Sequence, residues 1–319
     1  MPIDLSAVTL TELRYAVALA DRRHFGRAAA ACFVTQPTLS AQIAKLERTL
    51  GVKLFERSSK SVHPTVEGEE IVREARAVLA AAERIVDVAR SRSEPMTGTW
   101  RLGVIPTLAP YLLPWLVPAI REAFPKLALV VREMKTSLVL AELLEHRIDS
   151  GLLALPVEGA GLAAEPLFEE PFFLLAPESH PLAGRPSVRE ADLGGELVLL
   201  LEEGHCLRDQ ALSICSRAGA LEATRDGDFR ATSLETLRHL VAGKMGLTLM
   251  PALALPATSP GSEVAAVPFA EPAPSRTMAL VFRKGHPRAR DYKKIAAFVR
   301  GRLPASVRLP RKVRSQSSS

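Results

Sequence analysis

The sequence predicts a mixed α/β protein with three parts: a small helical unit at the amino terminus, one long helix, and a larger α/β unit. Apolar residues recur at helical spacing through the first fifty residues. A second apolar series then advances by alternating steps of four and three. From Trp100 onwards, short apolar strands alternate with amphipathic helices, as in a sheet with helices on its faces. The 319 residues suffice for two or three units with separate cores.

A helix over 9–22 is the first predicted element, because its apolar residues share one face. A shorter, alanine-rich helix over 26–32 follows, and the turn 33–35 leads to a third helix. Thr35 suits the N-cap of this third helix, and Gly51 suits the residue that ends it. Two helices separated by a tight turn, the second of them capped, are typical of a helix-turn-helix.

A small hairpin is predicted after the third helix. Strands at 52–57 and 62–65 flank the polar turn 58–61, which places Lys60 at a basic tip. We therefore expect a winged helix-turn-helix DNA-binding domain over residues 1–66.

The third helix presents short hydrogen-bonding side chains near its start, and such side chains suit base edges and phosphates in a major groove. Basic residues nearby are placed to neutralise flanking phosphates, which would make the DNA affinity depend on salt. The predicted DNA-binding residues are Arg27, Gln36, Pro37, Thr38, Ser40, Gln42, Arg57 and Lys60. A polar surface helix without a partner remains the alternative.

Positive charge is concentrated at the two ends of the chain. Of the formal net charge of +6, residues 1–66 contribute +4 and residues 300–319 contribute +6, which leaves −4 for residues 67–299. A positive end on an acidic body suits a protein that meets a polyanion such as double-stranded promoter DNA. The alternative is that basic termini only aid solubility. We expect residues 303–319, rich in Ser and Arg, to form a disordered basic tail.

A linker helix is predicted over 67–92. Its apolar positions follow the a/d pattern of a coiled coil, and small residues among them permit close approach of a second helix. These positions are Ile71, Ala75, Val78, Ala82, Ile85 and Ala89. We interpret the helix as a dimerisation element, and the alternative is that it packs on the core of its own domain.

A hinge is predicted at Ser91 to Gly98, and residues 98–302 then form the regulatory domain. Proline-interrupted segments at 165–172 and 268–275 are candidate strands that cross between two lobes. Lobe I is expected at about 98–167 and 270–302, and lobe II at about 168–269. The strands expected in lobe I are 102–105, 128–132 and 150–155, with helices over 110–123 and 137–146.

Several classes of protein are excluded by composition. No apolar run reaches the ~18 residues that span a bilayer, and the start Met1 to Leu5 lacks the basic and apolar parts of a secretory signal. We therefore expect a cytoplasmic protein with no membrane partner.

Its three cysteines, Cys32, Cys206 and Cys215, form neither a disulfide framework nor a zinc pattern. No metal and no cofactor are expected, so any cysteine chemistry should be redox chemistry.

The pair Cys206 and Cys215 would lie on one helix that starts after the turn Glu202 to Gly204. The partial positive charge at the helix start, with His205 and Arg208 nearby, favours a thiolate at Cys206. Nine residues on one helix separate the two cysteines by ~13.5 Å and place them on opposite faces.

A disulfide needs Cα atoms within ~7 Å, so this pair can bond only if the helix unwinds. That would be a two-state switch driven by a covalent bond. The alternative is that both cysteines, like Cys32 in the helical unit, are small apolar core residues.

Several motifs resemble the LysR-type family of bacterial regulators. These motifs are Phe25-Gly26-Arg27-Ala28-Ala29, Gln36-Pro37-Thr38-Leu39-Ser40, and the series Leu46, Glu47, Leu50, Gly51, Leu54, Phe55 and Arg57. The resemblance covers most of the chain. It implies a winged helix-turn-helix, a linker helix and a two-lobed, periplasmic-binding-protein-like regulatory domain. It also implies a homodimer or a dimer of dimers (a homotetramer) that acts with RNA polymerase.

Three downstream segments resemble the members of this family that sense hydrogen peroxide: 204–210, 229–237 and 251–254. The resemblance implies that Cys206 is the peroxidatic cysteine, oxidised first to a sulfenic acid, and that Cys215 is the resolving cysteine. It further implies a peroxide pocket formed by Thr107, Thr136, His205 and Arg276, and a cellular thiol reductant that resets the switch. The chain departs from the expected pattern at Ser213-Ile214 and Arg225-Asp226-Gly227, which puts the oxidation kinetics in doubt.

Three functions remain open at this point. The first is a peroxide-responsive regulator, switched by a reversible Cys206–Cys215 disulfide, that activates antioxidant genes. The second is a LysR-type regulator that binds a small organic effector between its lobes and leaves the cysteines unused. The third, a thiol peroxidase, would not need the DNA-binding and dimerising parts, so we do not expect an enzyme.

Overall fold

The computed structural model describes residues 5–57, 62–93, 95–157, 159–220, 230–255 and 263–310. It divides into two compact units, an amino-terminal unit of Met1–Glu94 with Leu144–Arg147, and a larger α/β unit of Pro95–Leu143 with Ile148–Ser319. A search of the described residues found no helix with the length and apolar character needed to cross a membrane.

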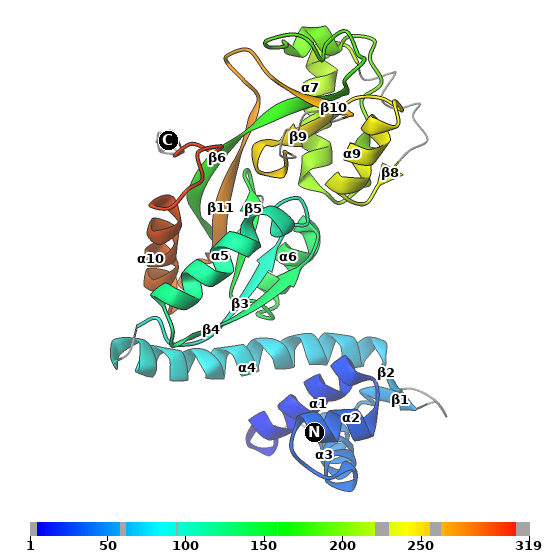
Figure 1. The fold of residues 1–319 in the computed structure, drawn as a ribbon. Coiled ribbons are helices and arrows are strands. Elements are labelled where there is room, and N and C mark those ends of the chain that lie inside the picture. Colours follow the sequence, from blue (N-terminus) through cyan, green and yellow to red (C-terminus); the bar gives the residue numbers. More distant parts are fainter. Residues whose placement is uncertain are drawn as a thin grey trace, which may run out of the picture. The chain divides into compact units, whose positions relative to one another are not determined.

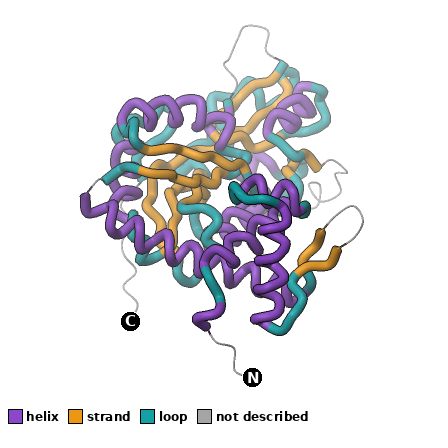
Figure 2. The backbone as a smooth tube through the Cα atoms, turned by 90° about the horizontal axis from the view of Figure 1, so that it is seen from below, coloured by secondary structure: helices purple, strands orange, loops and turns teal. Residues whose placement is uncertain are grey.

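The amino-terminal unit is a three-helix domain with a hairpin beside it (Figures 1 and 2). Thr9 and Glu12 form a capping box at the start of the first helix, and Thr35 and Gly51 cap the third as predicted. The hairpin pairs Phe55 with Pro64. The turn 58–61 and Lys60 lie outside the described residues. The elements are a 3-10 turn η1 (Leu5–Ala7), α1 (Leu10–Arg22), α2 (Phe25–Ala31), α3 (Gln36–Leu50), β1 (Phe55–Arg57) and β2 (Val62–Pro64).

A buried carboxylate joins the third helix to the hairpin. Glu47 on α3 is 7% exposed, and its Oε1 accepts hydrogen bonds from the backbone N–H groups of Leu54 at 2.9 Å and Phe55 at 3.3 Å. Its other oxygen pairs with Lys53 at 3.0 Å. Because unpaired buried N–H groups are costly, this carboxylate fixes the path of the chain into the wing.

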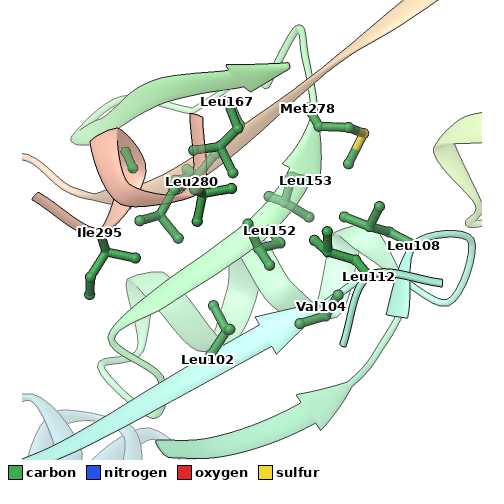
Figure 3. Close-up of a cluster of buried hydrophobic side chains, with 14 of the residues drawn as sticks. Leu102, Val104, Leu108, Leu112, Leu152, Leu153, Leu167, Met278, Leu280 and Ile295 are labelled. Atoms are coloured by element: carbon green, nitrogen blue, oxygen red, sulfur yellow. The ribbon is translucent and has the colours of Figure 1, made fainter. Parts of the chain in front are cut away.

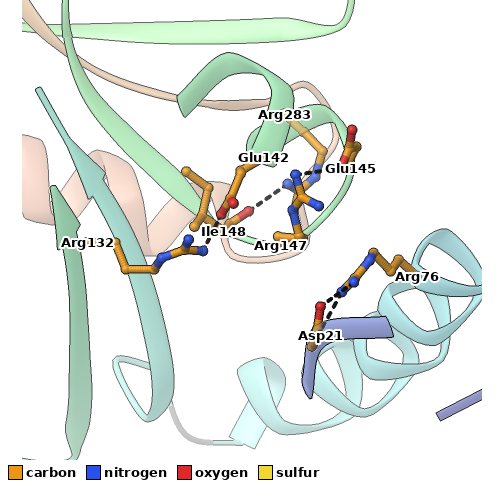
Figure 4. A network of polar contacts seen from close by, with 8 residues as sticks. All are labelled: Asp21, Arg76, Arg132, Glu142, Glu145, Arg147, Ile148 and Arg283. Carbon is orange, nitrogen blue, oxygen red and sulfur yellow. Dashed lines mark hydrogen bonds and ion pairs between the residues drawn. The ribbon is translucent and has the colours of Figure 1, made fainter. Parts of the chain in front are cut away.

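The apolar seam of the long helix α4 (Val66–Ser93) is covered near the start of the helix and exposed further along it. Ile71 and Ala75 pack against the core of the amino-terminal domain, and Arg76 pairs with Asp21 of α1 (Figure 4). Val78 and Ile85 are 46% and 73% exposed. The alternative of a helix on its own core is therefore correct for the first turns, and only the later apolar positions are free for another helix. The helix also continues two residues beyond the predicted start of the hinge.

The α/β unit is built on one sheet with the order β10-β6-β11-β5-β3-β4, to which β9 adds beside β6. Strand β3 runs parallel to β4 and β5, whereas β11 is antiparallel to both β5 and β6. The strands are β3 (Gly98–Val104), β4 (Leu127–Glu133), β5 (Ser150–Ala154), β6 (Leu162–Pro177), β9 (Thr248–Pro251), β10 (Val264–Pro268) and β11 (Ser275–Arg283). A separate small sheet pairs β7 (Leu200–Leu201) with β8 (Arg230–Ala231). The helices are α5 (Ala109–Ala123), α6 (Thr136–Leu144), α7 (Cys206–Ala218), α9 (Leu234–Ala242) and α10 (Ala289–Arg300), with 3-10 turns η2 (Glu190–Leu193) and η3 (Ala252–Ala254).

Two separate hydrophobic cores divide this unit into lobes that the long strands β6 and β11 connect (Figure 1). The lobe I core contains Leu102, Leu152 and Leu280 (Figure 3), and it extends along β6 as far as Phe168. Phe172, four residues later on the same strand, already belongs to the lobe II core. Figure 4 shows Arg283 at the end of β11, where its guanidinium donates to the Ile148 carbonyl at 2.8 Å.

Two predictions about the end of the chain were wrong. The predicted crossing segment 268–275 mostly connects β10 to β11, because its prolines have no N–H to donate to a ladder. The expected disorder of residues 303–319 does not apply to residues 303–310, where Val307 is buried and Arg308 forms a β-bridge with Glu169. Residues 311–319 lie outside the described residues.

Candidate functional site

Helix α7 starts at the candidate redox cysteine, as the sequence predicts. Cys206 is its first residue and His205 is the N-cap, but no side chain caps this end of the helix. The short strand β7 (Leu200–Leu201) precedes the turn that leads to this helix. Gly204, with φ +89, makes the turn into the helix, a conformation that strongly favours glycine.

The two cysteines of α7 contact the cores of different lobes. Cys206 is half-buried and packs against the lobe I core, whereas Cys215 is fully buried in the lobe II core. No disulfide joins the two thiols, and the helix between them is continuous. At 1.5 Å rise per residue, the helix separates them by ~13.5 Å, so no disulfide can form in this conformation.

A lysine of lobe I holds the turn that leads to Cys206. Lys135 Nζ lies 2.5 Å from Glu202 Oε1 and donates to the Glu203 carbonyl at 3.1 Å. Its Cδ would lie 3.1 Å from a Cβ at Gly204, so the stem of the lysine packs on the turn. Lys135 directly precedes Thr136, the first residue of α6. The start of α6 therefore lies beside the start of α7.

His205 is buried beside these charges. Burial is the main cause that lowers its pKa, the Lys135 ammonium lowers the pKa further, and Glu202 opposes both. The His205 Nε2 to Glu202 Oε1 distance of 3.8 Å is too long for a hydrogen bond. Among the described residues, neither His205 Nε2 nor the buried Thr136 Oγ1 has a hydrogen-bond partner. Two buried polar atoms are thus available to a small polar molecule.

A second polar group lies where the crossing strands pass between the lobes. Arg276 on β11 is fully buried, and its Nη1 donates to Thr107 Oγ1 at 2.9 Å and its Nη2 to the Thr107 carbonyl at 3.0 Å. Its Nε donates to Glu170 Oε2 at 2.8 Å. Glu170 is also fully buried, and its other oxygen accepts from the Leu253 N–H at 2.8 Å.

Of the predicted pocket residues, the structure places Thr107 and Arg276 in direct contact. Lys135, the neighbour of Thr136, contacts the turn that directly precedes His205. Sequence reasoning missed Glu170 and Lys135. Arg208 donates to the Leu201 carbonyl at 3.1 Å, so part of its guanidinium is engaged by the backbone.

The predicted DNA-reading residues lie at the exposed start of α3 and beside it. Arg27, Gln36, Pro37 and Thr38 are exposed, and Ser40 and Gln42 are half-buried. The Arg57 side chain and Lys60 lie outside the described residues. Sequence reasoning did not single out Phe33, whose side chain is 96% exposed in the turn between α2 and α3.

Two expectations about cysteines and metals concern other parts of the chain. Cys32 is half-buried at the end of α2, where burial raises the pKa of its thiol and opposes thiolate chemistry. Within the described ranges, no group of three His, Cys, Asp or Glu residues is placed to hold a metal ion.

Two family models match the chain over most of its length. Residues 10–69 match the bacterial regulatory helix-turn-helix of the LysR family, and residues 93–304 match the LysR substrate-binding domain.

Similar proteins agree with these matches. The chain is 46% identical over 296 residues to the DNA-binding transcriptional dual regulator OxyR of Escherichia coli, covering 93% of this chain and 96% of that protein. A probable hydrogen peroxide-inducible genes activator of Mycobacterium avium is 41% identical, covering 94% and 96% of the two chains.

Solved structures give the same result. A full-length OxyR variant from Pseudomonas aeruginosa matches 92% of this chain and 95% of its own, with a TM-score of 0.76 and 37% identity. The reduced form of OxyR matches 66% of this chain and 98% of its own, with a TM-score of 0.60 and 42% identity. The chain therefore belongs to the LysR family of bacterial transcription regulators, and within that family it resembles OxyR.

Proposed function

We propose that this protein is a hydrogen-peroxide-sensing, DNA-binding transcription regulator, switched by a reversible Cys206–Cys215 disulfide, that activates antioxidant genes. The observation that carries the proposal is the placement of the two thiols on α7. Cys206 lies at the uncapped start of the helix against one lobe, and Cys215 is buried in the other. A bond between them requires the helix to open, so oxidation changes the fold.

The chemistry follows from the residues around the start of α7. The Cys206 thiolate attacks one oxygen of hydrogen peroxide, the O–O bond breaks, and the second oxygen leaves as hydroxide, which takes a proton to form water. The Cys215 thiolate then attacks the sulfenic sulfur of Cys206, forms the S–S bond and displaces the oxygen that remained on that sulfur, which leaves as hydroxide and is protonated to a second water. Two thiols supply the two electrons, and a cellular thiol reductant restores them.

We assign the peroxide pocket to Thr107, Thr136, His205 and Arg276. The unpartnered buried oxygen of Thr136 supports this assignment, since a buried hydroxyl normally has a hydrogen-bond partner. The lowered pKa of His205 favours the neutral ring, whose Nε2 can accept or donate a hydrogen bond as the tautomer allows. The hydroxyl groups of Thr107 and Thr136 can donate hydrogen bonds that orient peroxide and stabilise the oxygen that leaves.

The amino-terminal unit supplies the output of the switch. We assign promoter DNA contacts to the exposed start of α3, together with Arg27, Arg57 and Lys60. The exposed Val78 and Ile85 of α4 suit a homodimer or a dimer of dimers. Such an assembly would act on RNA polymerase in the cytoplasm. Each oxidation would be a stoichiometric signal and not a catalytic turnover.

A thiol count combined with a footprint tests the proposal. Hydrogen peroxide should remove two free thiols from the reduced protein and change its footprint on promoter DNA. Raising the salt concentration should weaken DNA binding steeply, because phosphate contacts release counterions. An unchanged footprint after peroxide, with a response only to a small organic effector, would contradict the proposal and support the second function.

A further inference from the structure

We infer that Glu170 is a positioning residue for the peroxide reaction: it holds Arg276, and through Arg276 it aims the Thr107 hydroxyl at the oxidant. This inference rests on the proposed function. Glu170 is not one of the four residues assigned to the peroxide pocket, so its buried carboxylate would act through Arg276.

The first step of the argument is the burial of the ion pair. The side chains of Glu170 and Arg276 are both 0% exposed, and they are direct cross-strand partners on β6 and β11. Taking both charges out of water is expensive unless their hydrogen bonds are satisfied. Here Glu170 uses one oxygen for Arg276 and the other for the Leu253 N–H.

The second step is the direction of the hydrogen bond to Thr107. A guanidinium only donates, so the Thr107 Oγ1 must accept from Arg276 Nη1. The Thr107 hydroxyl proton is then left for another acceptor. A peroxide oxygen is such an acceptor, and the oxygen that leaves as hydroxide gains most from this donor.

The third step concerns charge. Glu170 lies within hydrogen-bond distance of Arg276 and compensates its positive charge. A compensated guanidinium contributes less to stabilising a thiolate than an isolated one would. Its main effect is therefore the fixed orientation of Thr107, which it grips at both the hydroxyl and the carbonyl.

Two rates measured on one protein separate orientation from general thiol reactivity. In the full-length reduced protein, Glu170→Gln should slow the reaction of Cys206 with hydrogen peroxide by about ten- to a hundred-fold, because misplaced groups cost that much. The alkylation of Cys206 by iodoacetamide, which does not use the Thr107 hydroxyl, should not become slower, because a guanidinium without its compensating carboxylate favours the thiolate. Glu169→Gln, on the next residue of β6, is the matched control and should leave both rates unchanged.

A double variant tests whether the effect passes through Thr107. Thr107→Val should slow the peroxide reaction, and adding Glu170→Gln to it should cause little further loss, because groups that act through one another are not additive. Multiplied effects, or a Glu170→Gln peroxide rate equal to that of the wild type, would overturn the inference. So would equal losses in the peroxide and iodoacetamide rates.

Folding and the proposed function need separate checks. Thermal unfolding of the reduced variants establishes that they are folded. If Glu170→Gln does not fold, Glu170→Asp keeps the charge but shortens the reach, and an unchanged peroxide rate in that variant would contradict the positioning role. If the wild-type thiols themselves resist peroxide, the proposed function fails and the role of Glu170 fails with it.

Discussion

Helices α3 and α7 both begin directly after a turn, but their first turns are built differently. Thr35 caps α3 with its side chain, Pro37 lies in the first turn, and the helix ends at Gly51 in the left-handed conformation. The N-cap of α7 is His205, whose side chain makes no capping bond. A missing cap costs about 1 kcal/mol. The helix proposed to read DNA is thus fixed at its start, and the helix proposed to switch is easier to open there.

Within α7, the end that carries Cys215 is held more firmly than the end that carries Cys206. Cys215 is fully buried among lobe II residues, and Gly219 closes the end of the helix. Cys206 is only half-buried and rests against lobe I. We therefore expect unwinding to start at the Cys206 end. If the two helices are independent, a change in one of them should leave the behaviour of the other unaltered.

The largest effect is expected from Cys206→Ser. A serine hydroxyl does not react with hydrogen peroxide as a thiolate does. The variant should therefore lose the whole response of its footprint to peroxide, while its DNA binding in the reduced state stays intact. Footprints before and after hydrogen peroxide measure both properties. A normal response in this variant would show that Cys206 is not the attacking thiol.

Cys215→Ser should have a different and partial effect. Cys206 would still be oxidised, but no disulfide would hold the opened helix, so the sulfenic acid should accumulate. Labelling with a sulfenic-acid probe and mass analysis of the peptide measures this product. Cys32→Ser is the matched control, because Cys32 lies in the amino-terminal unit and should change neither the labelling nor the footprint. Absence of the sulfenic acid in Cys215→Ser would contradict the assignment of the resolving thiol.

The same contrast explains what the sequence could predict. The start and end of α3, the wing strands and the start of α7 follow from local signals, namely a capping threonine, a helix-ending glycine and a glycine turn. The seam of α4 was only half predictable, because periodicity marks an apolar face without saying what covers it. Ile71 and Ala75 face their own domain, and Ile85 does not.

Local sequence signals could not predict which residues from distant segments of the chain would contact one another. Glu170 and Arg276 are separated by 106 residues and meet only because β6 and β11 align in a particular register. Lys135 and Glu202 meet because two lobes place α6 beside α7. The family resemblance pointed to Arg276 but not to its partner. A single sequence offered no signal for Glu170 or for Lys135.

A moderate effect is expected from removing the cap of α3. Thr35→Ala should lower the free energy of unfolding of the amino-terminal unit by about 1 kcal/mol and weaken DNA binding, measured by denaturant unfolding and by titration. The rate of Cys206 oxidation should stay the same. Ser233→Ala removes the equivalent cap of α9, at the Thr236 N–H, and should leave DNA binding by the reduced protein unchanged. A slower peroxide reaction in Thr35→Ala would mean that the two helices are not independent.

The smallest effect is expected from pH, through His205. Because burial lowers its pKa in the folded protein below the ordinary value of 6.5, the unfolded chain takes up a proton first as the pH falls. Stability from this group is therefore complete above about pH 6.5 and decreases as the pH falls below it. Urea unfolding of the reduced wild type and of His205→Gln between about pH 8 and about pH 5 measures the difference, since the other groups titrate in both.

The Lys135 ammonium is the second cause of the lowered pKa, so its removal gives a graded control. Lys135→Gln should raise the pKa of His205 towards its ordinary value and reduce the pH dependence without abolishing it. Equal pH dependence in the wild type and in His205→Gln would show that the imidazole is not held neutral at the start of α7. The start of α7 would then differ from the start of α3 only in its missing N-cap bond, because a buried neutral His205 would no longer be a second difference.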